Sequence, residues 1–313
     1  MLLTNPIYPA SQKKLEDFCD VIIAPDTKVE TLKTLIKGCE GLIVRCQLPP
    51  DIFEAADVLK AVVRHGVGLD FIPVAAATDK KIPVANLPGS NTQAVVEYCL
   101  AAIFYFRRRL AQIDRQLRQD GWNKTRPIAD SLSEIESTTL GVLGVGAIGS
   151  KISQIALALG MEVIGLTRRP DLMPKGIKAV SKSELFKQSD IVLVSCPLND
   201  ETRGMVDEAM IGLMKPTAIL INIARGPIVD SKAIVGALKA GRLAGVAMDV
   251  HDHHPLDGSE LVFSAPNLLL TPHIASITAT SLQKMSEGSV NTLLEILQGQ
   301  KPSNIVNPEV FSN

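Results

Sequence analysis

One segment of the sequence restricts the fold more than any other. The apolar run Thr139–Val145 leads into the glycine pattern GxGxxG, formed by Gly144, Gly146 and Gly149, and a helical pattern begins at Ser150. In such a turn the first glycine permits the tight bend, the second leaves the backbone open to a phosphate, and the third lets the helix approach the strand. The unpaired N–H groups at the helix N-terminus attract that phosphate. We therefore predict a dinucleotide-binding βα unit with phosphate contacts at Gly144, Gly146, Ala147, Ile148 and Gly149.

Short apolar runs and helix-length segments alternate along nearly the whole chain, a pattern typical of parallel sheets with helical crossovers. From the glycine turn onward the predicted strands are Thr139–Val145, Glu162–Leu166, Asp190–Ser195, Ala218–Ile223, Gly245–Val250 and Leu268–Thr271. Six strands of this kind predict a doubly wound (Rossmann) fold. The first third predicts a smaller open α/β unit, with strands Val21–Ala24, Leu42–Arg45, Ala61–Arg64 and Pro83–Asn86 and helices Val29–Lys37 and Ile72–Asp79.

The chain length of 313 residues exceeds what one hydrophobic core usually serves, so two domains are expected. A long helical pattern runs from about Gln93 to Gln119, and the loop Asp120–Asp130 that follows holds the only tryptophan, Trp122. The last helix is predicted at Thr280–Gln298. We expect a dinucleotide-binding domain at residues 96–282 and a smaller, flavodoxin-like α/β substrate domain built from residues 1–95 and 283–313.

Composition narrows the classes of function. A formal net charge of −1, with Lys and Arg spread along the chain, argues against nucleic-acid and membrane-surface binding. No apolar run reaches the roughly 18 residues that span a bilayer, and the first residues have no signal-peptide pattern. The five cysteines form no CxxC pair, which is typical of reduced thiols in a cytoplasmic protein.

The residues after the second strand of the dinucleotide unit select the cofactor. NAD-binding units usually place an acidic residue there, which binds the ribose 2′-hydroxyl. In this sequence the strand Glu162–Leu166 is followed instead by Thr167, Arg168 and Arg169. Two guanidinium groups beside a hydroxyl would bind a 2′-phosphate through charge-assisted hydrogen bonds. We therefore expect NADP(H) to be preferred, with NAD(H) as the alternative if the two arginines only begin a solvated loop.

Five further motifs follow one another in order along the chain. They are Gly66–Asp70 (GVGLD), Cys196–Gly204 (CPLNDETRG), Ile221–Pro227 (INIARGP), Ala247–Val250 (AMDV) and Thr271–Ala275 (TPHIA). Together with the glycine turn they make nearly the whole chain resemble the D-isomer-specific 2-hydroxyacid dehydrogenase family. The resemblance implies an oxidoreductase that transfers a hydride between a nicotinamide cofactor and a small 2-keto or 2-hydroxy acid, in a cleft between the domains. It also implies a homodimer formed through the cofactor domain, to which the long helix and the Trp122 loop contribute.

The resemblance also assigns residues to the cofactor and the substrate. The cofactor contacts that it implies, besides the glycine turn, are Cys196, Pro197, Thr202, Ile223, Ala224, Asp249 and His273. Asp249 would contact the nicotinamide end, although a carboxylate in this place also serves as a strand-end cap. The backbone N–H groups of Val67 and Gly68 would bind the substrate carboxylate.

A second polar group on the substrate is suggested by the charged residues near the early strand ends. Arg45, Arg64 and His65 would surround that group together with the histidines of residues 251–254. This favours a hydroxypyruvate-, glyoxylate- or sulfolactate-like acid over one with a long apolar side chain. Arg64 is equally well explained as a structural strand residue.

His273 and Arg225 carry the predicted chemistry. Reduction of a 2-keto acid places a proton on the carbonyl oxygen, and histidine suits this step because its pKa lies near working pH. His273 matches the acid/base residue of the family and follows a strand, where a doubly wound sheet binds its ligands. Arg225 offers two parallel N–H bonds to the substrate, and we expect it to anchor the carboxylate and polarise the carbonyl.

The sequence departs from the family after Asp249. Most members carry a glutamate just before the proline here, and its carboxylate pairs with the catalytic histidine, whereas this chain has His254 before Pro255. Three alternatives are open. His254 or the nearby Asp252 orients His273 and shifts the pH optimum, or the histidine-rich loop recognises substrate while His273 acts without a carboxylate partner. In the third, activity is lost and the chain is a non-catalytic dinucleotide-sensing binding protein.

Two other interpretations of the chain are weaker. No metal site is expected, because adjacent side chains on the loop of residues 251–254 point in different directions. A Rossmann hydrolase that uses bound NAD without net redox would need further catalytic groups, and the sequence offers none.

Overall fold

The computed structural model describes residues 1–312 and divides them into two compact units. The central unit is Thr92–Ser276, and the terminal unit joins Met1–Asn91 to the segment that begins at Ile277. The sequence placed these boundaries after residues 95 and 282 instead. They differ because no helix is divided: α4 (Thr92–Arg108) lies wholly in the central unit and α11 (Ala279–Leu297) wholly in the terminal unit.

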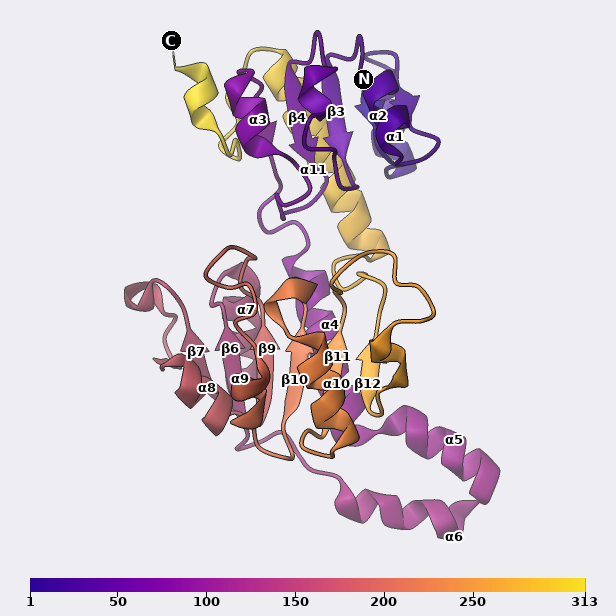
Figure 1. Cartoon of the computed structure of the whole chain (residues 1–313), viewed down its shortest axis with the longest axis vertical. Helices are drawn as coiled ribbons and strands as arrows, with labels where there is room; N and C mark the ends of the chain where they lie inside the picture. The colour runs from indigo at the N-terminus through magenta and orange to yellow at the C-terminus, as the bar shows by residue number, and fades with distance from the viewer. Residues whose placement is uncertain (313) are drawn as a thin grey trace. The chain divides into compact units, whose positions relative to one another are not determined.

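The central unit is built on a parallel sheet of seven strands (Figure 1). They are β6 (Thr139–Leu143), β7 (Glu162–Leu166), β8 (Ile177–Ala179), β9 (Ile191–Val194), β10 (Ile219–Asn222), β11 (Gly245–Met248) and β12 (Leu268–Leu270). Their order, β8-β7-β6-β9-β10-β11-β12, is the doubly wound order with one further strand, so the predicted Rossmann fold is confirmed. The order reverses between β6 and β9, and folds of this kind bind their ligands at the carboxyl ends of the strands beside that point.

The sequence did not predict the edge strand β8. It has only three residues, of which Lys178 and Ala179 are exposed, so no apolar run marks it. Helices cover both faces of the sheet and bury two apolar cores (Figure 1). α4 and α7 (Ala147–Ala158) pack on one face, and the other face is covered by α8 (Lys182–Gln188), α9 (Glu208–Gly212) and α10 (Ser231–Lys239).

The helix predicted from Gln93 to Gln119 is in fact two helices, α4 and α5 (Leu110–Asp120). Arg109 separates them with a left-handed backbone, φ 48°, which a regular helix of L-residues does not accommodate. The short helix α6 (Trp122–Thr125) follows. α5 has no buried residue, and α5 and α6 extend away from the central sheet in Figure 1.

The terminal unit has a parallel sheet of five strands in the order β2-β1-β3-β4-β5. They are β1 (Leu2–Leu3), β2 (Ile22–Ile23), β3 (Gly41–Val44), β4 (Ala61–Arg64) and β5 (Val84–Ala85). This is the flavodoxin-like order, so that prediction is also confirmed. Besides α11, the helices of this unit are α1 (Pro9–Glu16), α2 (Val29–Leu35) and α3 (Val74–Asp79).

Short 3-10 helices complete the described chain. They are η1 (Ile52–Glu54), η2 (Arg126–Ser131), η3 (Pro170–Leu172), η4 (Gly226–Ile228), η5 (Leu261–Ser264) and η6 (Pro308–Phe311). None of the helices within residues 1–312 is both long and apolar enough to cross a membrane. The same residues contain no cluster of three or more His, Cys, Asp or Glu side chains that could hold a metal ion.

Candidate functional site

The glycine turn between β6 and α7 has the shape that a dinucleotide phosphate requires. A Cβ atom on Gly144, whose φ is 101°, would lie 2.5 Å from the backbone nitrogen of Cys196. One on Gly149 would lie 2.4 Å from the carbonyl oxygen of Gly144. A Cβ on Gly146 would meet no atom within 4 Å, so the space in front of this residue is open. Gly146 is also the N-cap of α7 and offers no side-chain acceptor to the first N–H groups of the helix. These groups are therefore available to a pyrophosphate, and the residues present fit the cofactor.

The loop that was expected to select the cofactor follows β7. Arg168 and Arg169 are both exposed, and the backbone N–H of Arg169 donates to the Thr167 hydroxyl at 3.4 Å. Neither guanidinium has an ion-pair partner among the described residues. The end of β7 is thus positively charged.

The other predicted cofactor residues follow successive strands of the same sheet. Cys196 and Pro197 lie after β9, Ile223 and Ala224 after β10, and Asp249 after β11, all at the carboxyl ends. Burial raises the pKa of the Cys196 thiol to about 11, so the thiol next to the glycine turn is neutral. The Thr202 hydroxyl donates to the carbonyl oxygen of Pro197 at 2.7 Å and so shapes this loop. A direct contact between Thr202 and the cofactor stays a prediction.

Asp249 anchors the loop that carries His273. Its side chain accepts hydrogen bonds from the Thr271 hydroxyl (2.6 Å) and from the backbone N–H groups of Ile274 and Ala275 (both 2.8 Å). Asp249 is 1% exposed, and burial raises its pKa although these donors oppose the shift. The carboxylate therefore serves as the strand-end cap that the sequence left as an alternative, and it holds His273 in a left-handed turn with φ 57°.

Sequence reasoning missed one member of this network. The hydroxyl group of Tyr98, on α4, lies 2.8 Å from the hydroxyl group of Thr271. Burial raises the pKa of Tyr98 to about 12, so its hydroxyl stays protonated over the working pH range. The available signal was a phenol hydroxyl within a helix that otherwise buries apolar side chains.

Three histidine rings from the loops that follow β11 and β12 lie next to one another. The ring centroids of His251 and His254 are 5.7 Å apart, and those of His254 and His273 are 5.2 Å apart. Nε2 of His251 lies 3.0 Å from the carbonyl oxygen of Thr271, which fixes the first ring. His253 turns away, because its Nε2 pairs with Glu260 at 2.7 Å.

His254 cannot replace the charge of a glutamate. Burial lowers its pKa, and the positive charges of His251, His253 and Arg225 lower it further, while Asp249 opposes them. Its ring is therefore mostly neutral near pH 7. Asp252, the other residue considered as a partner for His273, is exposed.

Arg225 reaches this group from the loop after β10. The side chain of Asn222 fixes the loop, with its carboxamide donating to the carbonyl oxygen of Arg225 (3.0 Å) and accepting from the N–H of Ala224 (3.1 Å). A Cβ on Gly226 would lie 2.1 Å from the backbone of His251, so the two loops touch. The half-buried Arg225 therefore belongs to the same group of side chains as the histidines.

In the terminal unit, His65 and Arg45, which were predicted to contact the substrate, each contact another group of the protein. His65 is 4% exposed, and its Nε2 lies 2.9 Å from the hydroxyl oxygen of Ser286 on α11. Burial, with the charges of Arg45 and Arg64, lowers its pKa to about 3. These contacts point to a structural role for His65. The guanidinium of Arg45 donates to the backbone carbonyl of Pro6.

The turn after β4 keeps two backbone donors open. Arg64 shapes it by donating to the carbonyl oxygens of Gly68 (3.1 Å) and Val44 (2.8 Å), as the structural alternative expected. The side chain of Asn86 donates to the carbonyl oxygen of Val67 at 2.7 Å. The N–H groups of Val67 and Gly68 have no acceptor within residues 1–312.

The Rossmann unit and its glycine turn define a dinucleotide-binding protein, and comparison with known proteins identifies its family. The model of the D-isomer specific 2-hydroxyacid dehydrogenase NAD binding domain matches residues 100–275. The chain is 34% identical to a glyoxylate reductase of Thermococcus gammatolerans, over 99% of this chain and 96% of that protein. The chain belongs to the D-isomer-specific 2-hydroxyacid dehydrogenase family.

Two solved structures extend the comparison to the whole fold. One is an acyclic imino acid reductase in complex with NADPH and D-Arg, with a TM-score of 0.88 and 29% identity over 98% of this chain and 100% of that chain. The other is the D-lactate dehydrogenase of Aquifex aeolicus in complex with NAD and lactic acid. It has a TM-score of 0.86 and 28% identity, over 98% of both chains. A nicotinamide dinucleotide is therefore the cofactor class.

Proposed function

We propose that the protein reduces a small 2-keto acid of the glyoxylate or hydroxypyruvate type, with NADPH as the preferred reductant. The observation that carries the proposal is the meeting of the loops after β10, β11 and β12, which brings Arg225, His254 and His273 together. They lie at the same edge of the sheet as the glycine turn. The activity named for the Thermococcus gammatolerans relative supports the substrate class.

In this reaction, side chains of the protein donate the proton and stabilise the negative charge of the substrate. A bound nicotinamide would supply the hydride that reaches the carbonyl carbon. His273, as the imidazolium, donates its proton to the carbonyl oxygen as negative charge develops there. Arg225 binds the carboxylate and stabilises the charge on that oxygen. The backbone N–H groups of Val67 and Gly68 are hydrogen-bond donors without an acceptor within residues 1–312, and such donors can bind a carboxylate.

His254 sets the proton affinity of His273 in this proposal. A carboxylate beside a histidine favours the imidazolium and raises its pKa, whereas a neutral imidazole gives no such stabilisation. We therefore expect His273 to lose its proton at a lower pH than it would beside a glutamate. The rate of 2-keto acid reduction should accordingly begin to fall, as the pH rises, at a lower pH than it would with a glutamate beside His273.

The preference for NADPH rests on Arg168 and Arg169, because no carboxylate stands at the end of β7 to repel a 2′-phosphate. The imino acid reductase, whose structure is similar to this chain, is in complex with NADPH, and this supports the proposed preference. The Arg168→Ala/Arg169→Ala double variant should lower kcat/KM for NADPH at least tenfold, since removing one charge-assisted hydrogen bond weakens binding by about that much. kcat/KM for NADH should stay unchanged. Arg242→Ala, an exposed arginine elsewhere in the central unit, is the matched control.

The catalytic assignment is tested by NADPH oxidation with glyoxylate, hydroxypyruvate, sulfopyruvate and the bulky phenylpyruvate. His273→Ala and Arg225→Ala should each lower kcat/KM by about a hundredfold or more. His253→Ala, from the same loop, should change it little because that ring pairs with Glu260. Full activity of the His273 variant would refute the mechanism. Tight binding of NADPH without turnover of any acid would support the dinucleotide-sensing alternative instead.

We also propose that two copies of the chain associate through α4, α5 and α6. Among exposed apolar side chains of this region, Trp122 is 69% exposed and Leu110 is 66% exposed. α5 buries no residue within one copy, so its apolar face needs a cover from outside. Sedimentation equilibrium of the parent and of Trp122→Ala tests this association, and a monomeric parent would contradict it.

The cytoplasmic location expected from the cysteines stays a prediction.

A further inference from the structure

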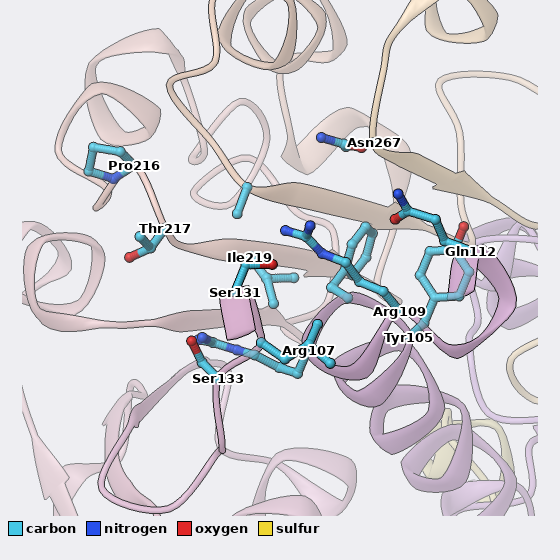
Figure 2. Close-up of a pocket in the computed structure, with 13 residues that line it drawn as sticks. Tyr105, Arg107, Arg109, Gln112, Ser131, Ser133, Pro216, Thr217, Ile219 and Asn267 are labelled. Carbon is cyan, nitrogen blue, oxygen red and sulfur yellow. The ribbon is translucent and has the colours of Figure 1, made fainter. Parts of the chain in front are cut away.

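A cavity of about 350 Å³ at the corner between α4 and α5 (Figure 2) is lined by elements of the proposed interface between two copies, and we assign it to that interface. Another cavity, of about 220 Å³, lies in the terminal unit. Its wall consists of Ala10, Ser11 and Lys14 from α1 and of Glu287, Val290 and Asn291 from α11. Neither the proposed reaction nor the proposed interface uses any of these residues.

The two helices that form this cavity are fixed to each other. Apolar side chains of both helices belong to one buried core. The backbone N–H of Tyr8, the N-cap of α1, donates to the hydroxyl oxygen of Ser286 on α11 at 3.0 Å. Nζ of Lys14 donates to the carboxamide oxygen of Asn291 at 2.7 Å. The cavity is therefore a constant feature of the packing of α1 on α11.

One positive and one negative side chain line the cavity without pairing. Within residues 1–312 Nζ of Lys14 has no carboxylate oxygen within 4.0 Å, and the carboxylate of Glu287 has no cationic nitrogen within that distance. The carboxylate of Glu287 accepts instead from the neutral carboxamide of Gln283, at 2.8 Å. Glu287 precedes Asn291, which holds Lys14, by about one helical turn, or ~5.4 Å along α11. The two charges of the wall sum to zero, which suits a ligand with one positive and one negative group.

Ser11 adds a buried hydroxyl group to the wall. The residue is 4% exposed, and its Oγ is buried without a hydrogen-bond partner in the described part of the chain. A serine inside a helix can donate to the carbonyl oxygen four residues earlier. Ser286 and Ser289 of α11 do so, at 2.7 and 2.8 Å, whereas Ser11 does not. A ligand atom in the cavity would supply the partner that this buried hydroxyl lacks.

We propose that this cavity binds a small α-amino acid as its zwitterion. The carboxylate of the ligand accepts hydrogen bonds from Lys14 and Ser11, and its ammonium group donates to Glu287, so both charges form charge-assisted bonds. α1 begins without a side-chain cap, and its first N–H groups also favour the carboxylate. The side chains of Ala10 and Val290 are apolar, and about 220 Å³ leaves room for a short side chain such as that of alanine or serine. A dicarboxylate or a diamine would instead place a like charge beside Glu287 or Lys14.

The test is a calorimetric titration of the full-length protein with L-alanine, without dinucleotide or 2-keto acid, so the result does not depend on the proposed reaction. Lys14→Met and Glu287→Gln should each weaken the Kd for L-alanine about tenfold, because each removes a charge-assisted hydrogen bond. Lys13→Met removes the same charge from an exposed position on α1 outside the cavity, and should leave the Kd unchanged. Propionate lacks the ammonium group and ethylamine lacks the carboxylate, so each should bind at least about tenfold more weakly than L-alanine.

Ser11→Ala is a further variant that keeps the test open if a charge variant does not fold. It should weaken the Kd for L-alanine about threefold, and it should raise the urea midpoint of the ligand-free protein because a buried hydroxyl without a partner is removed. An unchanged Kd in both Lys14→Met and Glu287→Gln, or equal weakening by Lys13→Met, overturns the proposal. Propionate that binds as tightly as L-alanine overturns it too, because the cavity is then a simple anion site. So does the absence of saturable binding by L-alanine, glycine and L-serine.

Discussion

The Thr271→Val substitution removes one hydroxyl from the network that anchors the loop of His273. In the structure this hydroxyl donates to Asp249 at 2.6 Å and contacts the hydroxyl of Tyr98 at 2.8 Å. Asp249 keeps its two backbone N–H donors after the change. A hydrogen bond to a charged group contributes about 1.5–3 kcal/mol, so the free energy of unfolding should fall by about 2 kcal/mol at neutral pH.

The loss should depend on pH, because the hydroxyl of Thr271 acts on the pKa of Asp249. Burial raises this pKa, and the hydrogen bond from Thr271 is the largest influence that lowers it. Without that bond the pKa of Asp249 in the folded protein rises further above its unfolded value. A carboxyl group of this kind favours folding most below its unfolded pKa, and this contribution is lost as the pH rises through the folded pKa. The variant should therefore approach the parent near pH 4 and fall furthest below it above pH 6.

Urea unfolding at pH 4.5 and 7.5 measures both effects, and Tyr98→Phe is the matched control. The phenylalanine removes only the neutral end of the network, and the loss of about 1 kcal/mol should be the same at both pH values. A displaced loop should also lower kcat of Thr271→Val while the KM for the dinucleotide changes little. Equal losses at both pH values, or a Tyr98→Phe effect as large as that of Thr271→Val, would refute the anchoring by Asp249.

Four other substitutions test three separate parts of the structure. His254→Glu should move the alkaline limb of kcat/KM for 2-keto acid reduction upward by about one pH unit, because a carboxylate stabilises the imidazolium of His273; an unmoved limb means that the two rings are not coupled. Gly149→Ala should lower the free energy of unfolding of the dinucleotide-free protein by about 1–3 kcal/mol, because its Cβ would lie 2.4 Å from a carbonyl oxygen. Gly146→Ala meets no atom within 4 Å, so it should weaken dinucleotide binding with stability unchanged, and equal stability losses in the two variants would contradict the packing argument. His65 has a pKa of about 3 in the folded protein, so the unfolded chain alone binds a proton below pH 6.5 and stability falls from there toward pH 3; His65→Asn should flatten this slope, measured by urea unfolding.

The sequence alone predicted the fold class of both units and the dinucleotide-binding turn, although it missed the two-residue strand β1. Strands of a parallel sheet are continuous apolar runs, and the glycine turn needs its three glycines at fixed spacing, so each of these features is readable from neighbouring residues. Such local patterns failed where the signal was short or steric. β8 has too few apolar residues to be seen, and no residue type announces that the backbone at Arg109 turns left-handed and divides the long helix.

Only the tertiary structure decided what several polar residues do. Asp249 became a loop anchor because β11 and β12 lie side by side and bring the hydroxyl of Thr271 and two N–H groups to its carboxylate. The buried ring of His65 contacts the hydroxyl of Ser286 because α11, more than two hundred positions away in the chain, packs beside it. Hydrogen bonds and burial depend on which distant segments meet, and a pattern of neighbouring residues does not contain that information.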